Sequence, residues 1–66
     1  MTSFKETDDI LEFAMDAEQR SIDFYTNLAD KAKSEKVAEV FRTMVRDAIQ
    51  HKNRLMDIHQ QGIYMF

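Results

Sequence analysis

The sequence predicts an all-α protein: an antiparallel hairpin of two helices that forms a four-helix bundle by homodimerisation. Three observations predict this fold. The chain has no proline and a single glycine, Gly62, so little in it interrupts a helix. Two apolar stripes each recur at alternating steps of three and four residues, the spacing of one helix face. Further apolar residues widen both stripes beyond a two-stranded contact, so another layer of helices is needed to cover them.

The first helix is expected from about residue 8 to about residue 33. Asp8 and Asp9 provide an acidic start, and Asp16 is placed to pair with Arg20 four residues later. Its centre carries one residue of a metal-ligand type, Glu18, within a mostly apolar stripe. The stripe consists of Leu11, Ala14, Glu18, Ser21, Tyr25, Leu28 and Ala32.

A polar interval at residues 30–35 predicts the turn, at about residues 33–35, with Ser34 as the N-cap of the next helix. The second helix is expected from about residue 35 to about residue 60 and is ended by Gly62. Its stripe also holds one polar residue, His51. The stripe consists of Val37, Phe41, Met44, Ala48, His51, Leu55 and Ile58. The apolar tail, residues 62–66, packs across the bundle end, contacts a partner or continues in a longer protein, and the sequence leaves these alternatives open.

The composition limits the class of protein. A chain of 66 residues makes one domain, here residues 1–66, and buries little core alone. No cysteine is present, which excludes disulfides and thiolate metal sites. Nine basic and twelve acidic residues, net charge −3, argue against nucleic acid as a partner. Without a long apolar run or a signal core, the protein is expected to be cytoplasmic and not membrane-bound.

The turn predicts which residues of the two helices meet. Glu18 and Ala48 are each fifteen residues from Lys33, so they lie at the same level of an antiparallel hairpin. His51 is one turn further along, within reach of Glu18, and a two-fold copy brings a second such pair to the same region. Asp47 is placed to accept a hydrogen bond from His51 and leave its other nitrogen for a metal ion.

The residues alone leave structural alternatives to a metal site open. Glu18 is equally suited to pair with Arg46, with Arg54 or with its own symmetry copy. On spacing alone, His51 is most simply a hydrogen-bonded core histidine. His59 is expected to be exposed near the helix end, and the five methionines are scattered enough to be gap-filling residues.

Several segments of the chain resemble rubrerythrin-like members of the ferritin-like superfamily. In the first helix they are residues 10–18, Ile-Leu-Glu-Phe-Ala-Met-Asp-Ala-Glu, with residues 22–25 and 28–29; in the second they are residues 40–41, 51–55 and 58. The resemblance covers about residues 8–62 and implies a di-iron carboxylate site, with one Glu from the first helix and a Glu-x-x-His from the second. By position it implies Glu18 and His51 as metal ligands, with Tyr25 as the aromatic partner of Glu18.

One family ligand does not match. The bridging glutamate expected three residues before His51 is replaced by Ala48. Asp47 is a poor substitute, because a shift of one residue turns a helical side chain by about 100°. A dimer then offers four ligands, two from each chain, which suit one Fe²⁺, Zn²⁺ or Mn²⁺ ion better than two bridged irons.

Three functions follow from this departure. The first is a ferritin-like helical domain with a reduced or altered metal site, which binds iron, zinc or manganese. The second is a metal-free structural or protein-interaction module that has lost di-iron chemistry. The third, ranked last, is a competent di-iron peroxidase or ferroxidase that recruits Asp47. Whether the chain is an enzyme is left undecided.

Overall fold

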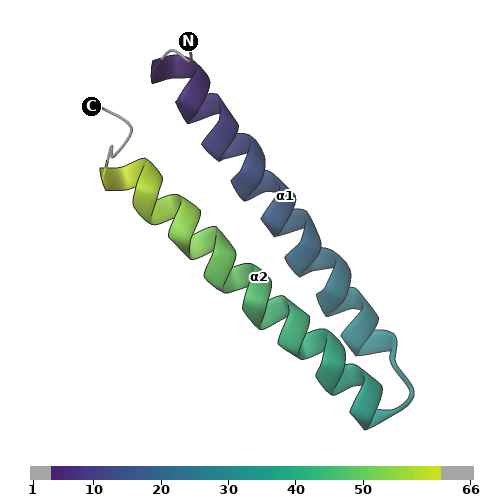
Figure 1. Cartoon of the computed structure of the whole chain (residues 1–66). Helices are drawn as coiled ribbons and strands as arrows, with labels where there is room; N and C mark the ends of the chain where they lie inside the picture. The colour runs from purple at the N-terminus through teal and green to yellow at the C-terminus, as the bar shows by residue number, and fades with distance from the viewer. Residues whose placement is uncertain (1–3, 62–66) are drawn as a thin grey trace.

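The computed structural model describes the backbone of residues 4–61 and the side chains of residues 9–61. This part of the chain is all-helical and forms an antiparallel hairpin of α1, Phe4–Lys31, and α2, Glu35–Gln61 (Figure 1). The first helix starts four residues before its expected start and ends two residues before its expected end. Residues 62–66, which include Gly62 and the apolar tail, lie outside the described residues.

The turn between the helices is stabilised by backbone and side-chain hydrogen bonds. The Ala32 amide donates to the Ala29 carbonyl at 3.4 Å as α1 ends. Ser34 then caps α2: its Oγ accepts from the Val37 amide at 3.4 Å and its carbonyl accepts from the Ala38 amide at 2.9 Å. Serine is suited to this position because its side chain satisfies an amide that has no partner within the helix.

An aromatic pair shows the register between the helices. Tyr25 and Phe41 stack across the hairpin with ring centroids 6.1 Å apart and an angle of 20° between the ring planes. Each of them is eight residues from Lys33, so the pair fits the register that the turn predicts. The edge of Phe24 also meets Tyr25, at a centroid separation of 5.2 Å.

The hairpin is too thin to enclose a core. It measures 49 × 15 × 15 Å between Cα atoms along its principal axes. Among the described side chains, only Leu11, Ala38 and Ala48 are buried, while nine large hydrophobic side chains stay exposed. Neither helix in the described part has an apolar stretch that is long enough to cross a membrane.

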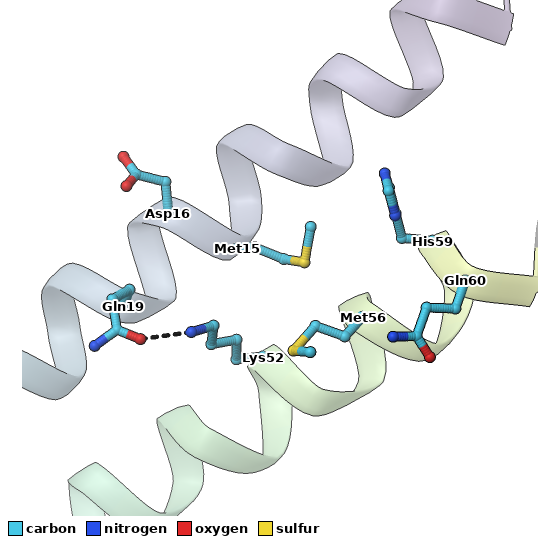
Figure 2. A pocket seen from close by; sticks show the side chains of 7 residues that line it. All are labelled: Met15, Asp16, Gln19, Lys52, Met56, His59 and Gln60. Atoms are coloured by element: carbon cyan, nitrogen blue, oxygen red, sulfur yellow. Dashed lines mark hydrogen bonds between the residues drawn. The ribbon is translucent and has the colours of Figure 1, made fainter.

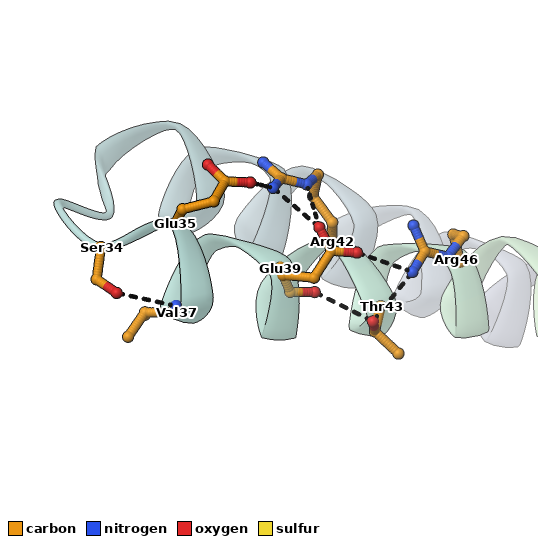
Figure 3. A network of polar contacts seen from close by, with 7 residues as sticks. All are labelled: Ser34, Glu35, Val37, Glu39, Arg42, Thr43 and Arg46. Carbon is orange, nitrogen blue, oxygen red and sulfur yellow. Dashed lines mark hydrogen bonds and ion pairs between the residues drawn. The ribbon is translucent and has the colours of Figure 1, made fainter.

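A network of charged side chains covers the first turns of α2 (Figure 3). Arg42 binds Glu35 and Glu39, with 3.0 Å between its Nη2 and Glu39 Oε1, and Arg46 reaches both Glu39, at 3.4 Å, and Thr43, at 3.1 Å. The hydrogen bond from Arg42, followed by that from Arg46, lowers the pKa of Glu39 below its usual value of 4.5. The same contact with Glu39 raises the pKa of Arg42.

Glu39→Gln is expected to reduce the pH dependence of the free energy of unfolding at acid pH. Because the pKa of Glu39 is lowered by folding, its ionised form favours the folded state at pH values above 4.5, and this contribution is lost as the pH falls through the lowered pKa. Chemical unfolding at a series of pH values measures the slope. Glu12→Gln, which removes an exposed carboxylate, is the control, and equal slopes in the two variants would contradict the prediction.

Tyr25→Phe is expected to change the free energy of unfolding of the metal-free protein by less than about 0.5 kcal/mol. The stacked ring is kept in this variant, and within the described residues the Tyr25 hydroxyl makes no hydrogen bond. Tyr25→Ala removes the contact with Phe41 and is expected to cost about 2 kcal/mol or more. Urea unfolding measures both values, and a large loss in Tyr25→Phe would show that the hydroxyl has a partner.

Candidate metal site

Glu18 and His51 meet between the two helices near the middle of the hairpin. Glu18 is at the centre of α1 and His51 is one turn past the centre of α2. His51 Nδ1 lies 3.7 Å from Glu18 Oε2. The Glu18 side chain is 28% exposed and that of His51 is 59% exposed, so the pair opens to one side of the hairpin.

The spacing of these two atoms suits two ligands of one ion. At 3.7 Å they are too far apart for a hydrogen bond. Metal–oxygen and metal–nitrogen bonds of a tetrahedral zinc site place two such donors about 3.3 Å apart. A side-chain movement of well under 1 Å therefore brings Glu18 and His51 to ligand spacing.

The other side chains proposed around the pair are placed differently. Asp47 is exposed and makes no hydrogen bond to His51 among the described residues. Tyr25 contacts the aromatic residues of the hairpin and, within this part of the chain, does not bond to Glu18. The alternative ion pairs of Glu18 are also missing from the described contacts: Arg46 binds Glu39 instead, and Arg54 is exposed.

Ala48 occupies the level at which the family pattern has a carboxylate. It is one of the three buried side chains, with 6% of its surface exposed. No group of three or more His, Cys, Asp or Glu side chains suited to a metal ion occurs among the described residues. A single hairpin thus provides two ligand-type side chains at this point, Glu18 and His51.

The opposite side of the hairpin carries a polar bridge and an open groove that were not predicted. Lys52 Nζ donates to Gln19 Oε1 at 2.5 Å (Figure 2). The groove has a volume of about 460 Å³ and is also lined by Met15, Met56 and His59. Gln19 and Lys52 each follow a member of the Glu18–His51 pair by one residue. This offset is the sequence signal from which their contact could have been predicted.

His59 corrects one expectation. It was expected to be exposed near the end of the helix, but it is half-buried and lines the groove beside Met56. The reason is its position on α2: it lies seven residues after Lys52, on the same side of the helix. The groove therefore extends to the last turns of α2.

Comparison with known proteins identifies the family to which the helical hairpin belongs. The family model described as Rubrerythrin matches residues 9–64, which include both helices over most of their lengths, Glu18 and His51. Searches among curated proteins and among solved structures gave no match. Since the family model covers more than half of the 66 residues, the chain belongs to the rubrerythrin family, within the ferritin-like superfamily.

Proposed function

We propose that Glu18 and His51 bind a divalent metal ion in a reduced form of the rubrerythrin site. Iron is the first candidate, because the family usually binds it, and zinc and manganese accept the same ligands. The observation that supports the proposal is the 3.7 Å separation of Glu18 Oε2 and His51 Nδ1. The two helices, whose register is fixed by the turn, hold this carboxylate and this imidazole at that separation.

The two side chains have different tasks in this site. Glu18 supplies negative charge at a half-buried position, where an ion is less hydrated than on an open surface. His51 supplies a neutral nitrogen ligand and is the more exposed of the two. A bound iron ion adds redox chemistry and any of the three metals adds Lewis acidity.

Two protein ligands are fewer than the three or four that zinc sites in proteins use. The missing ligands come from water or from a second chain, and a homodimeric four-helix bundle brings a second pair of the same residues. Two bridged irons are not part of this proposal, because Ala48 replaces the bridging carboxylate. We also propose a cytoplasmic location for this protein, the location that the sequence analysis expects.

A metal-free structural or interaction module is the second candidate, and the burial of Ala48 favours it. A buried methyl group at the bridging position cannot ligate a metal ion. A half-buried carboxylate that has no metal is a cost to the fold, since its charge has lost part of its hydration. In this case Glu18→Gln leaves the stability unchanged or improves it, both with and without added metal.

The wild-type chain, purified without oxygen, is expected to bind Fe²⁺ or Zn²⁺ in stoichiometric amounts. Glu18→Ala and His51→Ala are each expected to weaken binding by at least about 100-fold, more than the loss of a residue that only orients a ligand. Native mass spectrometry with added metal measures the bound ions. His59→Ala is the matched control because this histidine lines the groove, and metal retained in both ligand variants would contradict the proposal.

Ala48→Glu is expected to increase the number of bound ions, because it completes a Glu-x-x-His pattern with His51 on one helix face. It is also expected to destabilise the metal-free protein, since the position is buried. Native mass spectrometry and urea unfolding measure these effects.

Asp47→Asn separates the proposal from the third candidate, a di-iron enzyme that recruits Asp47. The exposed position of Asp47 predicts unchanged metal binding in this variant. Loss of metal in Asp47→Asn, or no gain of metal in Ala48→Glu, would contradict the proposal that Ala48 leaves this site with fewer ligands.

A further inference from the structure

The groove between the helices brings together two methionines and a histidine. Met15 lines it from α1, and Met56 and His59 line it from α2. In Figure 2 the Met15 side chain extends from α1 into the space beside Met56 and His59, and the His59 ring points toward α1. Two thioether sulfurs and one imidazole are thus gathered in one groove, although the two methionines are far apart in the sequence.

Helix geometry explains why these side chains converge. Counted from Lys33, Met56 is five residues further along its helix than Met15, which separates their backbones by about 7.5 Å along the helix axes. Side chains on a helix lean toward its N-terminus. Because the helices are antiparallel, Met15 leans toward the open end of the hairpin, whereas Met56 and His59 lean back toward the turn. All three are therefore directed into the same stretch of the groove.

The three side chains are suited to bind one ion that enters from solvent. Met56 and His59 are three residues apart and share one side of α2. Met56 is 38% exposed, while Met15 and His59 are half-buried. A methionine has three rotatable bonds, so its sulfur can adjust to an ion without a movement of the backbone. An imidazole has two nitrogens, and one can bind a metal ion while the other keeps a hydrogen bond.

The charges around the groove favour a soft monovalent ion over a hard divalent one. Lys52 brings a positive charge to the groove and donates a hydrogen bond to Gln19. Asp16 is the one carboxylate among the described residues that line the groove, and it binds Arg20. Hard divalent ions prefer carboxylate oxygens, whereas thioethers are ligands for Cu(I). The neutral sulfurs and the imidazole therefore match an ion that carries a single charge.

We propose that this groove binds Cu(I) through the sulfur atoms of Met15 and Met56 and one ring nitrogen of His59. Copper enters and remains as Cu(I), so binding requires no electron transfer. This site shares no residue with the pair of Glu18 and His51, and it does not rest on the function proposed for that pair.

Anaerobic titration of the full chain with Cu(I), in competition with the coloured chelator bicinchoninate, measures the affinity. Wild type is expected to bind one Cu(I) per chain. Met15→Leu and Met56→Leu are each expected to weaken binding by at least about 10-fold, the smallest loss seen when even a supporting group of a metal ligand is removed. Leucine replaces methionine at nearly the same volume, so the fold is kept while the sulfur is lost.

Met44→Leu is the matched control. Met44 is 40% exposed, close to the value for Met56, but it does not line the groove. This variant is expected to keep the wild-type affinity for Cu(I). Absence of Cu(I) binding in wild type overturns the proposal, and so does an unchanged affinity in Met15→Leu and Met56→Leu, because the methionines then serve only to pack the helices.

X-ray absorption at the copper edge tests the ligands directly. The bound ion is expected to have two sulfur neighbours and one nitrogen neighbour in wild type. One sulfur is expected to be missing in Met56→Leu. A copper ion surrounded only by nitrogen and oxygen in wild type overturns the proposal.

Crossed histidine variants separate this site from the site of the proposed function. His59→Ala is expected to lose Cu(I) and to keep Fe²⁺ or Zn²⁺, whereas His51→Ala is expected to lose Fe²⁺ or Zn²⁺ and to keep Cu(I). A chain that binds Cu(I) in this pattern but no Fe²⁺ or Zn²⁺ supports the groove site and contradicts the proposed function. Loss of Cu(I) in His51→Ala, with Cu(I) kept in His59→Ala, overturns the groove site, because copper then occupies the other pair.

Discussion

The antiparallel register of the two helices decides which side chains meet, and the candidate site depends on it. The register is fixed where Ser34 caps α2 immediately after the end of α1. From that point Tyr25 is carried to Phe41 and Glu18 to His51. A shift of one residue in either helix would turn its side chains by about 100° and bring Gln19 or Lys52 to the site instead. The site is therefore a property of the hairpin and its turn more than of any local motif.

The second constraint is that two helices alone cannot bury all of their apolar side chains. With three buried side chains and no enclosed interior among the described residues, the hairpin leaves apolar stripes on its surface. Ala48 contributes to this arrangement, because its small side chain is buried between the helices on the level of Glu18. The residue that removes a ligand from the family pattern is thus also a packing residue. One methyl group thus accounts both for the absence of a carboxylate at this position and for its burial.

Much of the hairpin could be predicted from the sequence, because helix periodicity, the absence of proline and the cap at Ser34 are local signals. The meeting of Glu18 with His51 followed from counting residues on either side of the turn. The start of α1 at Phe4 could not be fixed in this way, since the acidic pair Asp8 and Asp9 suits a first turn but also suits a later position in a helix that starts earlier. The burial of His59 and the bridge from Lys52 to Gln19 were missed for another reason: they depend on which side of the helix pair each residue faces, and the apolar stripes alone do not specify that for long polar side chains.

The same geometry links the exposed apolar residues to the candidate site. If Glu18 and His51 were on the side of the groove, beside Gln19 and Lys52, a partner that covered the exposed apolar residues would leave them in solvent. They instead open toward the stripe that His51 shares with Val37, Met44 and Ile58. A partner that covers these residues also removes water from the carboxylate and the imidazole, which strengthens their attraction for a cation. The exposed pair of Glu18 and His51 and the exposed apolar stripe are thus on one side of the hairpin.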